Sequence, residues 1–389
     1  MSKYINPRIR FKGFKSLWES IKLTDLGISV GGTAIESEFN PEGKYKVISI
    51  GSYSEESKYK DQGIRAVYSK KTEKRILEKD DLTMILNDKT STGKIIGRVL
   101  LIDEDNSYVY NQRTQRIVLN KNRFVPDFTF QLLNADINRN KIVRSAQGNT
   151  QIYVNWSDIS NLDYLIPESI EEQSAISSFF RILDDLLESY KDNLANYQSL
   201  KATMLSKMFP KTGQTVPEIR LDGFEGEWER KSLSEVCTIN SGRDYKHLKN
   251  GGIPVYGTGG YMLSVNEKLS DEDAIGIGRK GTINKPYLLS APFWTVDTLF
   301  YVICKIGYDL NYLFLIFQKI RWKKFDESTG VPSLSKKTIE KVVSKFPSYE
   351  EQRAIGSYFS NLDSLIAAHQ EKISQLETLK KKLLQDMFI

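Results

Sequence analysis

The residues best suited to chemistry lie in glycine-rich segments that also carry basic, hydroxyl and amide side chains. Residues 256–261 read YGTGGY, and residues 276–285 read GIGRKGTINK. Such segments can bring backbone amides and the forked donors of arginine to phosphates and base edges of DNA. In this part of the chain we expect DNA contacts from Arg243, Tyr256, Thr258, Tyr261, Arg279, Lys280, Thr282, Asn284 and Lys285.

The first half of the chain carries polar segments at corresponding places. Residues 87–94 read NDKTSTGK, and residues 111–114 read NQRT where the second half has TVDT at 295–298. A glycine-rich loop with basic residues is usually only a solvated turn, but its occurrence at matching places in both halves favours a functional role. Here the expected DNA-binding residues are Lys89, Thr90, Lys94, Asn111 and Arg113.

Motifs that would support catalysis are missing from the sequence. The Gly-Lys pair at 93–94 lacks the upstream glycine of a phosphate-binding loop, and no two prolines are adjacent, so the Asn-Pro-Pro-aromatic motif of amino-methyltransferases is absent. The two histidines and two cysteines form no nucleophile or zinc pattern. The net charge of +6 permits an anionic partner. We therefore expect a binding protein with no catalytic residue, no metal site and no cofactor of its own.

The elements that must position these loops occur twice. Residues 7–14 and 18–19 return at 217–224 and 228–229, an offset of 210, and a second block at 171–209 returns at 350–388, an offset of 179. The ends of each half match while the middles largely differ. This pattern indicates one scaffold that carries two different recognition domains.

The second repeated block has the heptad pattern of a coiled coil. Apolar residues recur at steps of three and four from Ile176 to Met208 and from Ile355 to Met387, and Lys201 and Lys380 take equivalent seam positions. Ser169 and Ser348 are candidate helix N-caps. Each helix of about 40 residues would be roughly 60 Å long. The short linker at 210–215 requires the second helix to run back along the first.

The middles are rich in β-branched and aromatic residues between turn signals. They predict short strands, for example at 45–50, 116–119, 253–256 and 299–303, and one helix in each half, near 127–138 and 310–321. The expected fold is α+β, with two globular target-recognition domains separated by a pair of long antiparallel coiled-coil helices and an internal pseudo-two-fold repeat. The expected boundaries are 1–165 and 210–345 for the domains and 166–209 and 346–389 for the helices.

The whole layout resembles the specificity subunit of type I restriction-modification enzymes. The resemblance rests on PEIRL with Gly-Phe and Trp at 217–228, RKGT at 279–282, GVPSL at 330–334 and the helix opening at 347–355. The first half departs from it, with GNTQI at 148–152 and no RKGT.

The resemblance implies that each domain reads one half of a bipartite double-stranded DNA site. It also implies two modification subunits that bring S-adenosylmethionine-dependent adenine methylation, and restriction subunits that use ATP and Mg²⁺. We expect the modification subunits to dock at the repeated helix starts, on Glu171, Glu172, Gln173, Glu350, Glu351 and Gln352. With readers on one face of the DNA, half-site centres would lie roughly 10 base pairs apart.

Two alternatives stay open on the sequence alone. A free-standing bipartite DNA-binding regulator would share this architecture but would bind tightly without any partner. A structural adaptor would use the coiled coil for proteins and show no sequence-dependent DNA binding. Because the sequence contains neither a signal core nor a run of about 18 apolar residues, we expect a cytoplasmic protein with no membrane association.

Overall fold

The computed structural model describes residues 7–388. It divides into two compact units: unit 1 comprises the chain up to Tyr190 together with the part from Lys372 on, and unit 2 comprises Lys191–Glu371. Each long helix belongs to unit 1 over one part of its length and to unit 2 over the other, because the two parts contribute to different hydrophobic cores. This division differs from the sequence-based boundaries, which set the helices apart as elements of their own.

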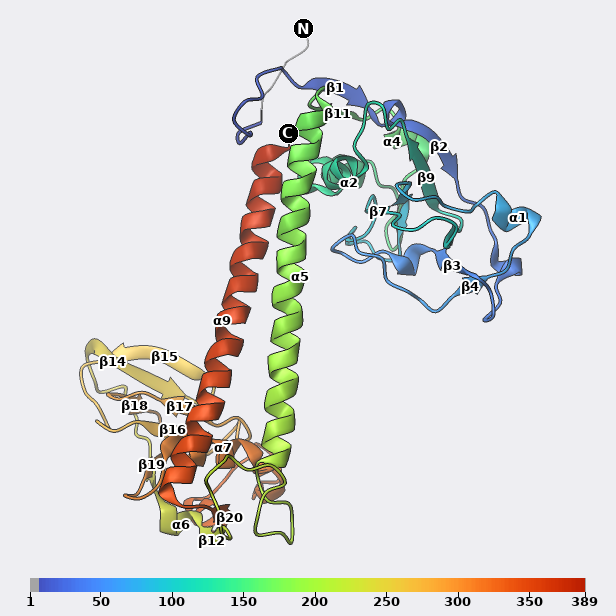
Figure 1. The fold of residues 1–389 in the computed structure, drawn as a ribbon. Coiled ribbons are helices and arrows are strands. Elements are labelled where there is room, and N and C mark those ends of the chain that lie inside the picture. The colour runs from blue at the N-terminus through green and yellow to red at the C-terminus, as the bar shows by residue number, and fades with distance from the viewer. Residues whose placement is uncertain (1–6, 389) are drawn as a thin grey trace. The chain divides into compact units, whose positions relative to one another are not determined.

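The elements are labelled in Figure 1. Unit 1 contains β1 (Glu19–Lys22), β2 (Gly27–Gly31), β3 (Tyr45–Ile48), β4 (Arg65–Ala66), α1 (Lys70–Glu73), β5 (Leu82–Ile85), β6 (Asn87–Asp88), β7 (Val99–Leu101), β8 (Tyr108–Tyr110), β9 (Thr114–Leu119), α2 (Pro126–Asn134), α3 (Asp136–Arg144), β10 (Ile152–Tyr153), α4 (Trp156–Ile159) and β11 (Asp163–Ile166). Unit 2 contains β12 (Glu229–Ser232), α6 (Leu233–Val236), β13 (Cys237–Ser241), β14 (Asn250–Gly257), β15 (Gly260–Val265), β16 (Ala274–Gly278), β17 (Tyr287–Leu289), β18 (Trp294–Thr295), β19 (Leu299–Cys304), α7 (Leu310–Lys319), α8 (Lys336–Lys341) and β20 (Val343–Phe346). Both units share α5 (Ile170–Lys207) and α9 (Tyr349–Met387).

The two units have the same sheet topology although their sequences differ. A four-stranded antiparallel sheet has the order β2-β9-β5-β7 in unit 1 and β13-β19-β16-β17 in unit 2. A three-stranded sheet has the order β4-β3-β8 in one and β15-β14-β18 in the other, with its last pair parallel in both. The repeat therefore extends through the middles, where the sequence alone did not reveal it.

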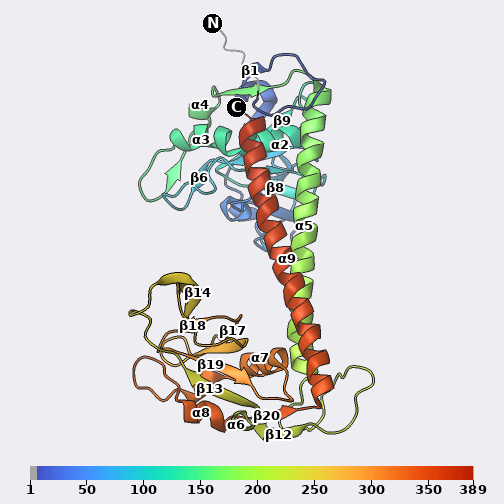
Figure 2. The ribbon, with the colours of Figure 1, turned by 90° about the vertical axis from the view of Figure 1, so that its left-hand side faces the viewer.

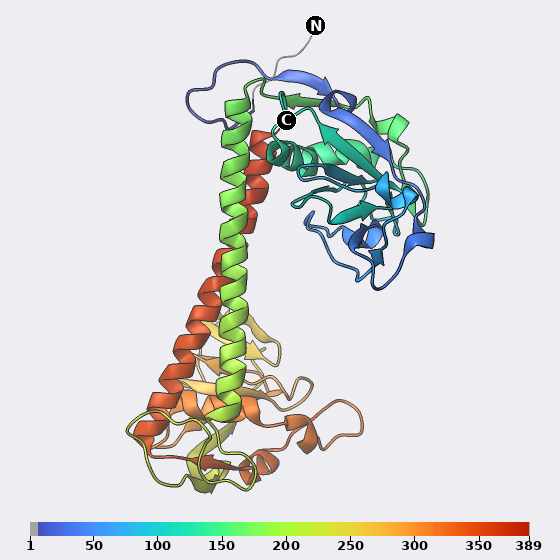
Figure 3. The same cartoon turned by 45° about the vertical axis from the view of Figure 1, so that its right-hand side comes forward.

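One helix in each unit links the sheet to the long helices. In unit 1, α2 lies beside the long helices (Figure 3). It contributes Phe128 and Leu132 to a core shared with the four-stranded sheet and α5. In unit 2, α7 lies beside β19 (Figure 2) and shares a hydrophobic core with β19 and α9. The first of these helices is shorter than expected, because it ends at Asn134 and a separate helix, α3, begins at Asp136.

The long helices begin as the sequence predicted. The hydroxyl of Ser169 accepts a hydrogen bond from the amide of Glu172 over 3.2 Å, and that of Ser348 accepts from the amide of Glu351 over 3.3 Å. These hydroxyls satisfy amides that a helix leaves free in its first turn. The N-cap assignments are confirmed.

The helices run antiparallel within each unit, and the seam lysines fix their register. In unit 1 the amino group of Lys380 lies 2.5 Å from the carboxylate of Asp184, and in unit 2 that of Lys201 lies 2.5 Å from that of Asp363. The two pairs are copies of each other under the offset of 179. The lysines therefore pair the two helices, consistent with a role in register.

The α+β class and the internal repeat are confirmed.

The C-terminal end of each long helix packs into the unit in which the other long helix starts. Phe388 is fully buried in unit 1, with its ring 5.7 Å from that of Phe128, whereas Phe209 is buried in unit 2, 5.6 Å from the ring of Tyr312. The backbone makes an equivalent contact in both units, because the amide of Ile9 donates to the carbonyl of Asp386 in unit 1 and that of Ile219 donates to the carbonyl of Lys207 in unit 2. Each unit therefore contains the helix end that the other repeat supplies.

Candidate nucleic-acid interface

The loop after β16 presents Arg279 and Lys280 at one edge of the unit 2 sheet. Both side chains are exposed. The backbone amide of Arg279 donates to the carbonyl of Thr298 over 2.8 Å, and that of Gly281 donates to the carbonyl of Pro332 over 2.8 Å. Because two neighbouring segments hold this loop, its cationic side chains extend from a fixed backbone.

The guanidinium of Arg279 is positioned by neutral groups. It lies 5.9 Å from the ring centre of Phe300, and its Nη1 lies 3.4 Å from the carbonyl oxygen of Asp297. These contacts set the direction of the side chain without neutralising its charge. An exposed guanidinium on a fixed loop can form the bidentate contacts with guanine that arginine commonly makes.

The turn between β14 and β15 adds tyrosines to the same unit. The Tyr287 hydroxyl donates to the carbonyl of Gly257 over 2.6 Å, which holds the turn against β17. The ring of Tyr256 lies 6.2 Å from that of Tyr287 and 6.4 Å from that of Tyr261, which is 63% exposed. Thr258 is half-buried within the turn. An exposed tyrosine hydroxyl here can reach phosphates or sugars of DNA.

A close backbone approach, present in both units, positions the loops after β2 and β13. A Cβ atom on Gly242 would lie 2.0 Å from the carbonyl oxygen of Val296, and one on Gly32 would lie 2.0 Å from that of Asn111. The two glycines are related by the offset of 210. In unit 2 this approach places the exposed Arg243, whose amide donates to the carbonyl of Thr295 over 2.9 Å.

The remaining predicted residues of unit 2 belong to the loop between β16 and β17. Asn284 and Lys285 are exposed, whereas Thr282 is half-buried. The carbonyl of Thr282 lies 2.3 Å from where a Cβ atom on Gly278 would be. The loop thus folds closely over a glycine and presents its later residues outward.

In unit 1 the loop after β5 occupies the corresponding place, because β6 pairs with β10 as Lys280 pairs with Ser333. Lys89 and Thr90 are exposed, and the Thr90 hydroxyl donates to the Asp88 carboxylate over 2.9 Å. The charge of Lys94 is shared with Glu55, 2.9 Å away, and this hydrogen bond raises the pKa of Lys94. Lys94 is therefore less available to a phosphate than Lys89.

The side chain of Asn111, which was predicted to contact DNA, is buried in the structure. Asn111 is 7% exposed, its amide oxygen accepts from the backbone of Ile35 over 3.1 Å, and its amide nitrogen donates to the carboxylate of Glu36 over 2.9 Å. The hydrogen bond from Asn111 lowers the pKa of Glu36. The side chain braces the loop after β2 from inside, and both its oxygen and its nitrogen are hydrogen-bonded within the unit.

A hollow of about 300 Å³ in unit 1 contains Arg113. Arg113 is exposed, its backbone φ is +65°, and its guanidinium lies 5.9 Å from the ring centre of Tyr153. Gln112, Asn155 and Trp156 line the same hollow. These three residues were not among the predicted ones. The position of Gln112 between two predicted residues was the only sequence signal for this group, because 155–156 lie far away along the chain.

The structure buries the second and third residues of both Glu-Glu-Gln motifs, which were predicted to form partner surfaces. Glu172 and Glu351 are each 1% exposed. Arg10 holds Glu172 through a two-pronged ion pair at 2.6 and 2.7 Å, and Arg220 holds Glu351 at 2.9 and 2.7 Å. The repeated Arg and Glu therefore bind each other within each unit.

The glutamines that follow have an internal role as well. The side-chain oxygen of Gln173 accepts from the backbone amide of Val125, next to α2, over 2.9 Å. That of Gln352 accepts from the amide of Asp309, next to α7, over 3.2 Å. Both glutamines are buried, so only Glu171 and Glu350 of the six predicted partner residues are exposed.

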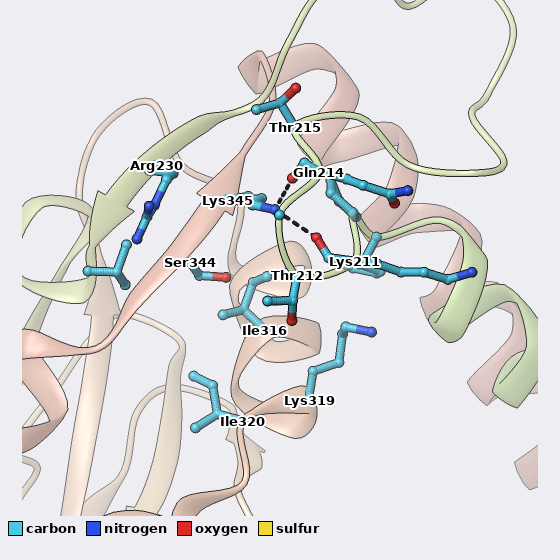
Figure 4. A pocket seen from close by; sticks show the side chains of 14 residues that line it. Lys211, Thr212, Gln214, Thr215, Arg230, Ile316, Lys319, Ile320, Ser344 and Lys345 are labelled. Carbon is cyan, nitrogen blue, oxygen red and sulfur yellow. Dashed lines mark hydrogen bonds between the residues drawn. The ribbon is translucent and has the colours of Figure 1, made fainter.

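A larger cavity in unit 2, of about 500 Å³, lies beneath the linker at 210–215 (Figure 4). The amino group of Lys345 donates to the carbonyls of Lys211 and Gln214, and that of Lys319 donates to the carbonyl of Leu205. Burial lowers the pKa of Lys319. The cavity shares no lining residue with the loops of the β14–β17 edge, and two of its lysines serve to hold the linker and the end of α5.

Comparison with known proteins identifies the family. The family model described as type I restriction modification DNA specificity domain matches residues 15–196 and 225–378. The chain belongs to this family of type I restriction-modification specificity subunits. It is 21% identical to the type I restriction enzyme MjaVIII specificity subunit of Methanocaldococcus jannaschii, over 94% of this chain and 91% of the relative.

Solved structures show the same fold. The S subunit of a type I restriction-modification system from M. genitalium superposes with a TM-score of 0.71 at 20% identity, and 99% of each chain is covered. A structure that describes complex assembly and conformational transition of the type I R-M system matches with a TM-score of 0.53 at 16% identity, over 95% of this chain and 97% of that one. Within residues 7–388, no helix has the length and apolarity needed to span a bilayer.

Proposed function

We propose that each unit reads one half of a bipartite double-stranded DNA target. The observation that carries this proposal is the shared sheet topology of two units whose loops differ at the same edge. One scaffold with two different loop sets suits two different half-sites. We expect DNA to contact the exposed cations and tyrosines of unit 2 and the residues of the Arg113 hollow in unit 1.

The chain would direct chemistry that partner subunits perform. In this proposal two modification subunits bind S-adenosylmethionine and methylate adenine, while restriction subunits use ATP and Mg²⁺, and all act in the cytoplasm. The chain itself supplies the choice of sequence and no catalytic group. Membership of the specificity-subunit family supports this assignment.

Mapping of methylated adenines in cells that carry this chain with its partners tests the proposal. We expect two different short half-sites separated by a fixed non-specific gap, with centres roughly 10 base pairs apart. One continuous short palindrome would contradict two separate readers. Tight, sequence-specific gel shifts by the isolated chain, with no effect of partners, would instead favour a free-standing regulator.

Lengthening both long helices should change the gap and nothing else. Seven residues inserted after Tyr190 in α5 and seven after Glu371 in α9 keep the heptad phase and add about 10 Å to each helix. We expect a methylome with both half-sites retained and a longer gap. The control is the same heptad inserted in the linker at 210–215, which should leave the gap unchanged. A lengthened variant with the original gap would show that the helices do not set it.

Replacing Arg279 with Ala should weaken recognition of one half-site. If its guanidinium reads a base, the loss is about 1–3 kcal/mol, or roughly 5- to 150-fold in affinity. Titration of the assembled complex on a panel of single-base variants should show relaxed preference at one position of one half-site. Lys336→Ala, which removes an exposed cation from α8, controls for net charge. Equal preferences in both variants would make Arg279 an ordinary surface charge.

A further inference from the structure

Among the residues that the structure describes, the cavity beneath the linker at 210–215 is lined by four cationic residues and by no acidic one. Its volume of about 500 Å³ lies in the range of cavities that hold small molecules. The cations come from the linker, β12, α7 and β20 (Figure 4), and they are Lys211, Arg230, Lys319 and Lys345. Ile316 and Ile320 add an apolar part to the same wall. The cavity therefore combines positive charge with an apolar surface.

Two of these cations oppose each other across a strand pair. β12 and β20 are antiparallel, and Arg230 is the direct partner of Lys345 in their register. Like charges at directly opposed positions destabilise a sheet. Within residues 7–388 no carboxylate forms an ion pair with either side chain, and the adjacent Glu229 is bound to Lys231 instead. The chain therefore leaves this pair of charges without a counter-charge.

The scaffold does not require these charges, because unit 1 has the same elements without them. β1 and β11 pair in the same register as β12 and β20, and there the opposed residues are Ser20 and Leu165. Lys319 corresponds to Ala135 when α7 and α2 are aligned on the amides that the repeated glutamines bind. Three cations of unit 2 thus stand where unit 1 has neutral residues. Charge gathered in one copy alone indicates a role particular to unit 2.

The three cations retain hydrogen-bond donors for a ligand. Arg230 is exposed, and within residues 7–388 its side chain donates to no other group, so all five of its N–H donors are available. Lys319 uses one of three donors on the carbonyl of Leu205, over 2.6 Å. Lys345 uses two on carbonyls of the linker and keeps one. These neutral carbonyls hold the amino groups in place beside the cavity.

We propose that this cavity binds a small phosphorylated compound of nucleotide size. Its phosphate oxygens would accept hydrogen bonds from Arg230, Lys319 and Lys345, and its negative charge would offset the opposed cations of β12 and β20. Its apolar part would contact Ile316 and Ile320. A phosphate of the DNA backbone has the same chemistry, but the cavity shares no lining residue with the loops of the β14–β17 edge. The inference therefore does not rest on the proposed function.

Isothermal titration calorimetry of the full chain with ADP, inorganic pyrophosphate and adenosine tests the proposal. The variant is Arg230→Gln, which removes one charge and keeps most of the length of the side chain. Lys337→Gln is the matched control, because Lys337 is an exposed cation of α8 that does not line the cavity. Circular dichroism melting checks folding.

We expect one ADP or one pyrophosphate to bind per unaltered chain, and adenosine, which has no phosphate, not to bind. The affinity for ADP should fall at least tenfold in Arg230→Gln and stay unchanged in Lys337→Gln. If Arg230→Gln unfolds, Arg230→Ser, which introduces the residue that unit 1 has at this place, is judged by the same criteria.

Three results of the titrations would overturn the inference: no binding of ADP or pyrophosphate, adenosine binding as tight as that of ADP, or an equal change of affinity in the two variants. A short DNA duplex that displaces ADP from the unaltered chain would overturn it as well, because the occupant would then be a phosphate of DNA. Each of these outcomes leaves the proposed reading of two half-sites standing.

Discussion

Glu351→Gln should lower the free energy of unfolding of unit 2 by about 3–5 kcal/mol. The substitution keeps the size of the side chain but removes the charge that Arg220 faces. The Arg220 side chain is only 19% exposed, and two of its nitrogens lie 2.7–2.9 Å from the Glu351 carboxylate. An arginine left in this place has lost its counter-charge while remaining shielded from water. Denaturant unfolding, followed by hydrogen exchange of unit 2 peptides, measures the loss.

The chain offers matched controls for this expectation. Glu172→Gln should have the same effect in unit 1, where Arg10 is held at 2.6 and 2.7 Å. Lys268→Ala breaks an exposed ion pair with Asp271 and should cost less than about 1 kcal/mol. Joint replacement of Arg220 and Glu351 by apolar residues should recover much of the loss. A loss as small as that of Lys268→Ala would mean that the ion pair does not hold the unit together.

The repeated motifs were found readily in the sequence, but the role of their charges was not. Glu172 and Glu351 follow a helix N-cap, where acidic residues are usually exposed, so the sequence favoured a surface role. Their partners, Arg10 and Arg220, lie 162 and 131 residues away along the chain. A periodic pattern reports which face of a helix is apolar, but it does not report which distant side chain arrives at a given place.

The same distinction separates the helices from the loops. The heptads of α5 and α9 are local and predict both helices closely. The shared topology of the middles depends on pairings such as β3 with β8, which join segments about 60 residues apart, and was not visible in unlike sequences. Asn111 and Arg113 were indistinguishable as polar loop residues. In the structure Asn111 faces inward to Glu36, whereas Arg113, whose backbone is left-handed, lines a hollow.

Phe388→Ala should destabilise unit 1, although the substitution is at the far end of the chain from most of that unit. Phe388 is fully buried, with its ring 5.7 Å from that of Phe128 and 6.0 Å from that of Phe180. Removing a buried phenylalanine ring costs about 3–5 kcal/mol. Hydrogen exchange measured peptide by peptide should show lost protection in β1–β11 and α2, and unchanged protection in unit 2.

Phe209→Ala supplies the reciprocal experiment, because Phe209 is the counterpart of Phe388 and lies in the core of unit 2, 5.9 Å from Trp228 and 5.6 Å from Tyr312. It should remove protection from unit 2 and leave unit 1 unchanged. Ile182→Ala, at a position that is 64% exposed in unit 1, should change stability by less than about 0.5 kcal/mol. If either phenylalanine variant weakened both units equally, the two cores would behave as one cooperative body. The crossed effect would instead show that each unit is stabilised by the helix end that the other repeat supplies, so that loss of either end unfolds one unit and leaves the other folded.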